Sequence, residues 1–561
     1  MPRLKFTRGS WAHCGATLAL SVIALLGCQR AITPAPYWQA ARPAFVFAEL
    51  YARVESEQLF NDSKSFADAQ PLRAPALILR DYRAAVPADR TQLAAFVQRN
   101  FAPPASWPEV PPAALDLPHY IAALWPLLLH PALQPPDFSS ALGVPFAYAV
   151  PGGRLRELHY TEAYFMMLGL IRDGRADLAH GMLDDCAALI NRFGHMPAGA
   201  RTYYLSRSGL PLFYRMIGLL YAEDPAAGYA SYLPELKREY SFWMQGSAGL
   251  APGHSIEHVV ALPDGALLNR CWDALGEPRD EAFREDTALA AHSAREPASL
   301  YRDRRAAAES GWGLSARWLA DPAQPASVQT TALLPVDLNS VLFGLEHAIA
   351  DGCERRHEQA CATEFLARAW HRKQAINRYL WSPAEGAYLD YNWRQGRPSS
   401  ILSAAMLYPL FVGIASGAQA KSVARLAWRR LLGTEGLAAT SPWGAHAGSP
   451  PDVWAPLQWI AVQGLSDYGE YGVARAITQQ WLGYLRHDFA VTGQLRERFA
   501  AEGTYAIAGD EGLPEGSLGT LAGVARGLLT MEPELAKLAP QTPMLNLLME
   551  EPSTPLLPWP F

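Results

Sequence analysis

The stretch Ala308–Leu319, AESGWGLSARWL, combines residue types that could form the wall of a catalytic cleft. A tight Ser-Gly-Trp-Gly turn leads into a helix-compatible run that contains Trp312 and Trp318. No side chain at the centre of the turn can donate a proton, and the carboxylate of Glu309 lies about one helical turn before Gly313. The stretch therefore raises the question of which group would supply an acid here.

The elements that must position this stretch are helices. Apolar residues recur at helical spacing in long segments, whereas strand-like alternation is nearly absent. Loops rich in Gly, Pro and aromatic residues join these segments. We therefore predict an all-α toroid of paired helices whose long loops form a cleft on one face. The clearest helical segments span residues 164–194, 363–381, 403–414 and 456–489.

The composition indicates a globular protein with a small neutral ligand. The chain has 561 residues, of which 50% are apolar and 18% are charged, and its net charge is -6. Acids and bases are scattered, which argues against a nucleic-acid partner and against a basic membrane-binding face. Aromatic residues reach 11% and include 17 Trp, and flat apolar rings are suited to sugar-binding clefts. Any single Trp is more simply a core residue, and we expect a monomer without a cofactor.

The N-terminus has the features of an export signal. A basic start is followed by an apolar run from Ala16 to Leu26 and then by Cys28. The ending Leu-Leu-Gly-Cys resembles a bacterial lipobox, in which Cys28 carries the lipid and Gln29 suits retention in the outer membrane. A conventional signal peptide with a chance cysteine is the alternative. We expect an envelope protein facing the periplasm that contacts the membrane only through this lipid.

Four cysteines remain after the export signal: Cys186, Cys271, Cys353 and Cys361. Export permits disulfides, and Cys353 and Cys361 are the closest pair, but spacing alone does not show that they meet. No Cys or His spacing typical of a metal site is present. We therefore interpret these cysteines as structural or free thiols and expect no metal.

The segment PGGRLRELHYTEAYF resembles the first signature of the trehalases, glycoside hydrolase family 37, whose usual form is P-G-G-R-F-x-E-x-Y-x-W-D-x-Y. Arg154, Glu157 and Tyr164 match this form. The resemblance covers nearly the whole mature chain. Further matching segments, in the family's order, are NDSKSFADA (61–69), YYLSRS (203–208), EPRDEAFRED (277–286), ESGWGLSARW (309–318), YLDYNW (388–393), WAPLQW (454–459) and TGQLRERF (492–499).

The resemblance implies an (α/α)6 toroid, as in six-hairpin glycosidases, that hydrolyses α,α-trehalose to two glucoses with inversion. Inversion needs a general acid and a general base about 6.5–9.5 Å apart. The family supplies the acid from S-G-W-D, so Gly313 occupies the position of the general acid. The resemblance assigns the general base to Glu497, which on its own would be a surface residue in a charged helix.

The resemblance also implies a set of sugar-binding residues. Planar guanidinium groups suit the hydroxyls of a sugar, and neighbouring carboxylates balance their buried charge. Taken singly, the arginines would be surface salt-bridge partners. The implied residues are Arg154, Arg207, Ser208, Arg279, Glu281, Gly311 and Glu511.

Departures from the family pattern concentrate in the expected cleft. The W-D of the first signature is Thr161-Glu162, and the Trp-Asp pair of the second is Gly448-Ser449. The closing G-F-G-W-T-N-G-V becomes GSLGTLAGV, so rings and hydrogen-bonding groups for one glucose are missing. Loss of a general acid costs about 10²–10⁴-fold in rate. The carboxylates that could stand in for it are Glu309, Glu162 and Asp280.

Three hypotheses follow. The chain is a trehalase-like hydrolase that is weakened or retuned to another α-glucoside, a non-catalytic sugar-binding or sensing lipoprotein, or a structural envelope protein with a collapsed cleft. A sugar binder requires Arg154, Arg207, Arg279 and Glu511 to converge. The predicted organisation is a lipoprotein-type signal peptide over 1–27, a tether over 28–45, a trehalase-like domain over 46–545 and a Pro-rich tail over 546–561.

Overall fold

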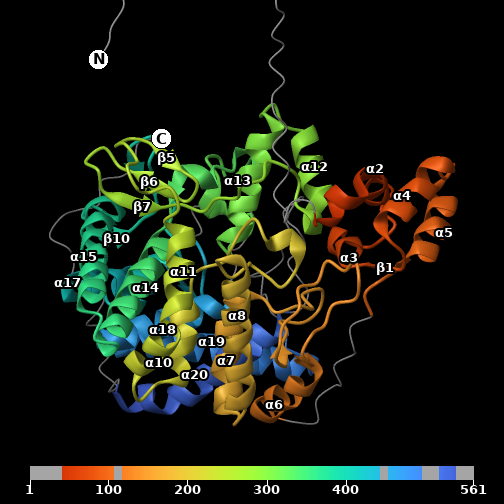
Figure 1. The fold of residues 1–561 in the computed structure, drawn as a ribbon. Coiled ribbons are helices and arrows are strands. Elements are labelled where there is room, and N and C mark those ends of the chain that lie inside the picture. Colours follow the sequence, from red (N-terminus) through yellow and green to blue (C-terminus); the bar gives the residue numbers. More distant parts are fainter. Residues whose placement is uncertain (1–40, 106–115, 442–452, 496–516, 539–561) are drawn as a thin grey trace, which may run out of the picture. The chain divides into compact units, whose positions relative to one another are not determined.

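The computed structural model describes residues 41–105, 116–441, 453–495 and 517–538, which belong to one compact unit spanning residues 37–561. Within these ranges the chain is mostly helical, and its strands are only two or three residues long (Figure 1). Residues 1–36 lie outside the described residues. The all-α prediction is confirmed.

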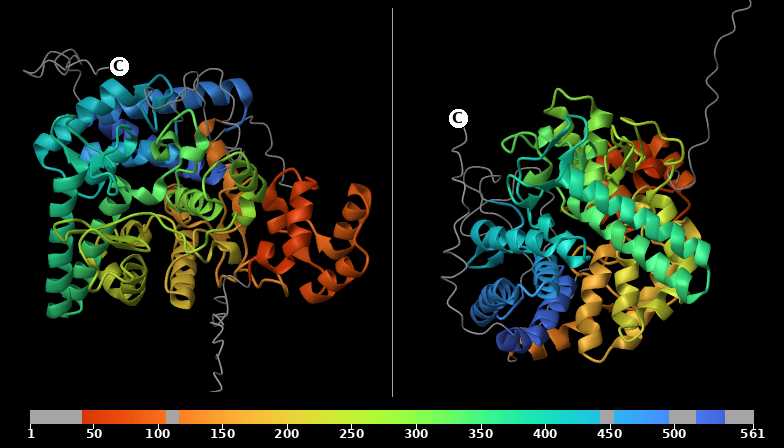
Figure 2. Two further views of the ribbon diagram at one scale, coloured as in Figure 1. Left: turned by 90° about the horizontal axis from the view of Figure 1, so that it is seen from above. Right: turned by 90° about the vertical axis from the view of Figure 1, so that its left-hand side faces the viewer.

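Six of the described helices form the inner wall of a closed ring. Helix α7 contacts α9, α9 contacts α14, and α14 contacts α16. Helix α16 contacts α18, α18 contacts α20, and α20 contacts α7, which closes the ring (Figure 2). The inner helices are α7 (Tyr160–Arg172), α9 (Phe213–Leu220), α14 (Val336–Arg355), α16 (Tyr408–Phe411), α18 (Ala455–Asp467) and α20 (Leu518–Leu538).

A second set of helices packs against the outside of this ring. Helix α8 contacts both α7 and α9, and α19 contacts both α18 and α20. Helices α10, α11 and α15 contact α14, and α6 contacts α20. An outer helix precedes each inner helix along the chain, as expected for the (α/α)6 toroid. The outer helices are α6 (Leu117–Leu128), α8 (Ala176–Phe193), α10 (Pro225–Ser231), α11 (Leu233–Trp243), α15 (Gln359–Ala375), α17 (Gly417–Leu426) and α19 (Tyr471–Thr492).

The two ends of the ring differ in the length of their connections. Each inner helix from α7 to α18 is followed by a turn of three to five residues, at 173–175, 221–224, 356–358, 412–416 and 468–470. The connections that lead into the inner helices are longer, for example 129–159, 194–212 and 244–335. The long connections that lead into the inner helices therefore share the end at which these helices begin, here called the loop end. The short turns share the opposite end, the turn end.

Other elements lie outside the ring or in the long connections. A second hydrophobic core includes Phe47, Leu50 and Phe66 together with Tyr203 from the connection before α9. The additional helices are α2 (Pro43–Ser56), α3 (Ser63–Ala67), α4 (Pro75–Ala84), α5 (Arg90–Asn100), α12 (Phe283–Ala291) and α13 (Pro297–Glu309). Four pairs of strands form two-stranded sheets: β1 (Gln70–Pro71) with β2 (Phe101–Ala102), β3 (Leu129–His130) with β4 (Tyr148–Ala149), β9 (Trp381–Ser382) with β10 (Ala387–Tyr388), and β13 (Leu432–Gly433) with β14 (Gly436–Leu437). In one three-stranded sheet β6 (Val259–Ala261) lies between β5 (Ser255–Ile256) and β7 (Leu267–Asn269). In the other, β11 (Tyr391–Asn392) lies between β8 (Leu333–Leu334) and β12 (Arg397–Pro398).

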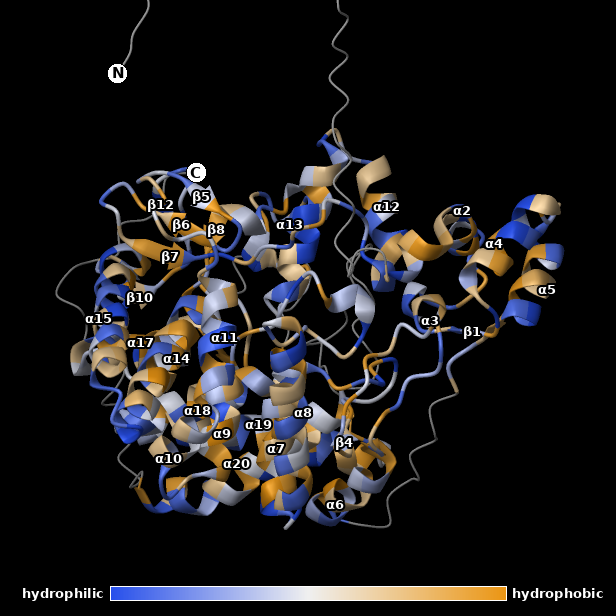
Figure 3. Ribbon diagram, viewed as in Figure 1, coloured by the Kyte–Doolittle hydropathy of each residue, from blue (hydrophilic) through white to orange (hydrophobic). Residues whose placement is uncertain are grey.

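Local sequence explains several of these elements. Asp62, Asp89 and Asp116 accept hydrogen bonds from first-turn backbone N–H groups and so cap α3, α5 and α6. Hydrophobic residues recur along α7, α14 and α20 (Figure 3). Helices α7 and α20 approach closely at Gly169 and Gly523, where an added Cβ on Gly523 would collide with the backbone of α7. This part of the ring therefore requires glycine.

The cysteines of the described chain divide into one bonded pair and two thiols. Cys353 and Cys361 form a disulfide across the turn between α14 and α15, a pairing that spacing alone left open. Cys186 and Cys271 are buried and free. Among the described helices, none is long and apolar enough to cross a membrane. Cys28 lies outside the described residues.

Candidate active site

The described residues that the trehalase resemblance singled out lie in the long connections at the loop end. The ring therefore brings segments that are far apart in the sequence to one end of the molecule. Those within the described ranges are Arg154 before α7, Arg207 and Ser208 before α9, and Arg279, Glu281, Gly311 and Gly313 before α14. Glu497, Glu511 and the Gly448-Ser449 pair lie outside the described residues.

A buried lysine joins three of the segments that match the family. Lys64 Nζ lies 2.7 Å from a carboxylate oxygen of Asp68 and 2.9 Å from Oε1 of Glu157. It also donates to the hydroxyl of Tyr203 at 2.9 Å. Burial would raise the pKa of Glu157, but Lys64 and its other cationic neighbours hold it well below its usual value. This network fixes the connections before α7 and α9 against α3.

The turn that contains Gly313 is open on one side. Gly311 and Gly313 have φ values of 77° and 58°, in the left-handed region that favours glycine. A Cβ added at either position would meet no described heavy atom within 4 Å. The chain thus has no side chain at position 313, and the described residues around it do not fill the gap.

Trp312, between these two glycines, is held from the opposite side. Its ring is buried, and its Nε1 donates to Asp337 at 2.8 Å. Arg317 lies 4.4 Å above the same ring and binds both Asp337 and Asp390 with distances of 2.7–2.8 Å. Trp312 therefore anchors the turn firmly, although Gly311 and Gly313 have no side chains.

Glu309 is engaged in the scaffold. Its carboxylate accepts from the backbone N–H groups of Ser208 at 2.9 Å and Trp272 at 2.8 Å. Nε2 of His258 lies 3.1 Å from one of its oxygens, and only 1% of the residue is exposed. Because both oxygens are occupied, Glu309 is poorly placed to act as a replacement acid.

The other two possible replacements for the missing general acid, Asp280 and Glu162, differ in how tightly their carboxylates are bound. Asp280 is fully buried and accepts from Arg42 Nε at 2.8 Å and from the backbone N–H of Ala44 at 2.7 Å. It therefore holds the N-terminal segment in place. Glu162, in the first turn of α7, has a side chain that is 29% exposed and lies 4.0 Å from Nδ1 of His159. Of the three, Glu162 is the least constrained.

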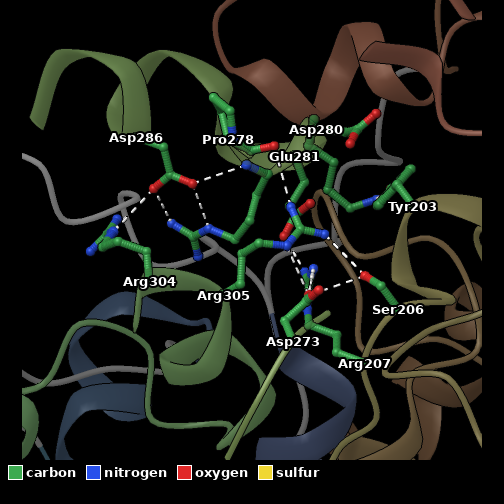
Figure 4. Close-up of polar contacts among 12 residues, drawn as sticks. Tyr203, Ser206, Arg207, Asp273, Pro278, Asp280, Glu281, Asp286, Arg304 and Arg305 are labelled. Carbon is green, nitrogen blue, oxygen red and sulfur yellow. Dashed lines mark hydrogen bonds and ion pairs between the residues drawn. The ribbon is translucent and has the colours of Figure 1, made fainter. Parts of the chain in front are cut away.

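Arg207 and Glu281 form the core of a buried polar cluster at the loop end (Figure 4). Nη2 of Arg207 donates to Oε1 of Glu281, and Nη1 lies 3.6 Å from Asp273. Among the described residues, Arg207 Nε and Nη1 and Glu281 Oε2 have no hydrogen-bond partner. The pair therefore retains two donors and one acceptor.

Glu281 remains ionised despite its burial. Burial would raise its pKa, but the charges of Arg207, Arg279 and Arg305 outweigh this effect and lower the pKa. An ionised carboxylate accepts hydrogen bonds and has no proton to donate. Glu281 is therefore suited to holding a hydroxyl and unsuited to general acid chemistry.

Arg279 has a different partner from the one suggested by its sequence neighbour Glu281. Its Nε and Nη2 donate to the two carboxylate oxygens of Asp286 at 2.9 and 2.7 Å, and Arg304 Nε donates to the same carboxylate at 3.0 Å. Burial opposes ionisation of Asp286, but both arginines hold its pKa far below its usual value. Arg279 thus contributes charge near Glu281 while its side chain is bound to Asp286.

Sequence reasoning missed Arg305 and Asp273 as members of the cluster. Arg305 Nε donates to Asp273 at 2.8 Å, and Nη2 lies 3.1 Å from the hydroxyl of Ser206 (Figure 4). Arg305 lies four residues before Glu309 on α13, so the two share a helix face. That spacing, directly before the Ser-Gly-Trp-Gly turn, is the signal that could have identified Arg305.

The two remaining residues that the resemblance assigned to sugar binding, Arg154 and Ser208, differ in their surroundings. Arg154 lies in a turn whose ends, Gly152 and Leu155, are paired through their backbones. The hydroxyl of Ser208 donates to the carbonyl of Met196 at 2.7 Å. Ser208 is thus used by the scaffold, and only its acceptor capacity remains for a ligand.

Comparisons with known proteins agree with this arrangement. The trehalase family model matches residues 58–531. A periplasmic trehalase of Pseudomonas aeruginosa is 44% identical over 510 residues, which are 89% of this chain and 92% of that protein. One from Xanthomonas campestris pv. campestris is 41% identical over 97% of both chains. The structure of a neutral trehalase from Saccharomyces cerevisiae shares the fold, with a TM-score of 0.57 and 23% identity over 77% of this chain and 83% of that one. The chain therefore belongs to the trehalase family, glycoside hydrolase family 37.

Proposed function

We propose that this protein binds trehalose or a related α-glucoside at the loop end and hydrolyses it poorly or not at all. Membership of the trehalase family and relatives named periplasmic trehalase support trehalose as the sugar. The observation that carries the proposed loss of activity is Gly313, which occupies the position of the general acid with no side chain to donate a proton.

The chemistry explains why this one position matters. In an inverting glycosidase one carboxylic acid protonates the leaving oxygen and a second carboxylate activates water. Glu497 is the proposed general base. Without the acid, the departing sugar leaves as an alkoxide, and the rate falls by about 10²–10⁴-fold. Glu309 is an unfavourable replacement, because its two oxygens already accept hydrogen bonds.

A non-catalytic sugar-binding or sensing role is the second candidate. Arg207 retains unfilled donors, and Glu281 beside it retains an unfilled acceptor, which suits neighbouring hydroxyls of a sugar. A Cβ added at Gly311 or Gly313 would meet no described heavy atom within 4 Å, which is compatible with a cleft at this turn. Arg154, Ser208, Arg279 and Glu511 are proposed to complete the binding site.

The decisive experiment measures glucose release from α,α-trehalose by the mature domain without Cys28. We expect little release by the wild type and an increase of roughly 100-fold or more in Gly313→Asp. Aspartate tolerates the left-handed backbone, and its Cβ would meet no described atom within 4 Å. Adding Glu497→Gln to Gly313→Asp should abolish the gain.

Two controls match this substitution. Gly313→Asn has nearly the same shape but no ionisable proton, so it should give no increase. Gly174→Asp places an aspartate in a turn with a φ of 76° and similar space, but at the turn end. Efficient glucose release by the wild type that Glu497→Gln abolishes would contradict the proposed loss of activity. If the wild type is silent, calorimetry with trehalose and glucose separates a sugar binder from a scaffold.

We propose that the protein is a lipoprotein of the bacterial cell envelope, anchored through Cys28 and facing the periplasm. The Leu-Leu-Gly-Cys ending of the apolar run supports this location, as do relatives named periplasmic trehalase. A membrane fraction should contain the wild type, whereas Cys28→Ala should release the chain. Equal distribution of both forms would contradict the anchor.

A further inference from the structure

A pocket lies at the turn end of the ring, opposite the connections that carry the family motifs. Its volume is about 480 Å³, within the usual range for small-molecule sites. Residues from α9, α10, α14, α16 and α18 line it, and Gly413 and Tyr468 place it beside the short turns. The wall is therefore built mainly from inner helices, and the outer helix α10 contributes Tyr229.

A buried phenol in this wall has no partner. Tyr214 is only 3% exposed, and its hydroxyl has no hydrogen-bond partner among the described residues. Gly344 on α14 leaves room for this hydroxyl, since an added Cβ there would collide with it. Burying an unpaired hydroxyl is unfavourable. A ligand that accepts or donates one hydrogen bond at this point would remove the penalty.

Charged groups of both signs line the same pocket. The guanidinium of Arg215 is packed 4.0 Å from the ring centre of Phe411. Asp351 and Asp467 face the pocket, and burial raises the pKa of each. His347 also lines the wall. A small anion would meet two carboxylates here, and a small cation would meet a guanidinium.

We propose that this pocket binds a neutral polyhydroxylated molecule of about the size of a monosaccharide. Hydroxyl groups donate to carboxylates and accept from a guanidinium or a phenol, so one such molecule satisfies both signs without carrying charge. The rings of Phe411 and Tyr468 supply apolar surface for the carbon skeleton. The pocket requires no residue of the loop end, so this inference is independent of the proposed sugar site there.

The test is calorimetric titration of the full mature protein with glucose and with glycerol, together with Tyr214→Phe. We expect Tyr214→Phe to weaken binding at the pocket roughly five- to tenfold, with an unchanged or raised Tm because the removed hydroxyl had no partner. A purely structural role for Tyr214 would lower the Tm and leave affinity unchanged. Tyr388→Phe is the matched control, since this buried hydroxyl donates to Asn377 away from the pocket. That control should leave the affinity unchanged.

The variant Arg207→Met distinguishes binding in the pocket from binding at the loop end. Binding in the pocket should persist in Arg207→Met, whereas binding at the loop end should be lost. Binding that survives Tyr214→Phe and Asp467→Asn but disappears in Arg207→Met would overturn the proposal, as would binding of glycine betaine without binding of glucose or glycerol. Crystals soaked in glucose supply a direct second measurement. Density beside Tyr214 supports the site, and its absence at saturating glucose rejects it.

Discussion

Two buried arginines at the loop end have opposite environments. Arg317 donates to Asp337 and Asp390 through Nε, Nη1 and Nη2, and two tryptophan rings pack against its guanidinium. Arg207 is equally buried, yet Nε and Nη1 have no hydrogen-bond partner within the described chain. Arg317 lies in the same connection as Gly313 and Arg207 in the connection before α9, and only Arg317 has a hydrogen bond on each of its three nitrogens.

The difference separates scaffold from binding surface. Arg317 uses four of its five N–H groups on two carboxylates, and those carboxylates bind Trp312 and the start of α14, so Arg317 holds both in place. A guanidinium with spare donors beside a carboxylate with a spare oxygen is incomplete without a partner. The comparison therefore predicts that substitutions at these positions will affect different properties.

The largest effect is expected for Arg317→Leu. It leaves Asp337 and Asp390 buried without their cation, which should lower the free energy of unfolding by about 3–5 kcal/mol. Denaturant unfolding followed by circular dichroism measures this loss. Arg378→Leu, at an exposed ion pair with Asp264, is the control and should change stability by less than about 1 kcal/mol. A small effect of Arg317→Leu would remove the distinction between the two arginines.

A smaller loss is expected for Asp286→Asn, by about 2–3 kcal/mol at pH 7, because Arg279 and Arg304 lose a charged acceptor. The pKa of Asp286 is lowered in the folded protein, so its contribution is present above about pH 4 and is lost as the pH falls towards the folded pKa. The two proteins should therefore become more alike in stability as the pH falls from 4 to 2. A difference that is constant with pH would contradict this account.

Arg207→Leu should lower the stability by only about 1–2 kcal/mol, because Arg279 and Arg305 still offset the charge of Glu281. Its main effect should be loss of sugar binding at the loop end, measured by calorimetry with trehalose. Arg207→Lys is the matched variant, which keeps the charge but loses the planar donors. Unchanged affinity in both variants would show that the spare donors do not serve a sugar.

The smallest effect concerns Glu239, a buried carboxyl that receives a hydrogen bond from Tyr160. Burial raises its pKa to about 8, although the hydrogen bond acts in the opposite direction. Between its unfolded pKa and about 8, only the unfolded chain loses the proton, so stability falls as pH rises. Glu239→Gln should remove this decline, a gain over the wild type of about 1 kcal/mol between pH 6 and pH 7. If the stabilities of the wild type and Glu239→Gln changed with pH in parallel, the raised pKa of Glu239 would be refuted.

The ring could be predicted from the sequence because its determinants are local or repeated. Helical spacing predicts helical segments over 164–194, 363–381 and 456–489, and the family motifs imply the six-hairpin arrangement. The structure divides the first segment between α7 and α8 and the third between α18 and α19, because short turns interrupt both. The separate core that contains Phe47 and Tyr203 was not predicted, because it joins residues more than a hundred positions apart that carry no shared pattern.

The site was predictable as a set of positions but not as a set of contacts. Motif spacing identified Arg207 and Glu281, which the structure joins through a hydrogen bond. The sequence did not reveal that Arg279 binds Asp286 or that Asp280 holds Arg42, a residue 238 positions away. Such pairings depend on how the connections fold back over the ring, which neither helical periodicity nor charge spacing encodes.

The one-sided environment of Gly313 has an evolutionary consequence. Trp312 anchors the turn by binding Asp337. At Gly313, the next residue, an added Cβ would meet no described atom within 4 Å. An exchange between aspartate and glycine there leaves the core untouched and needs a single nucleotide change. Selection for a folded protein would not oppose the loss of the acid, and a lineage could lose or regain the reaction without passing through an unstable ancestor.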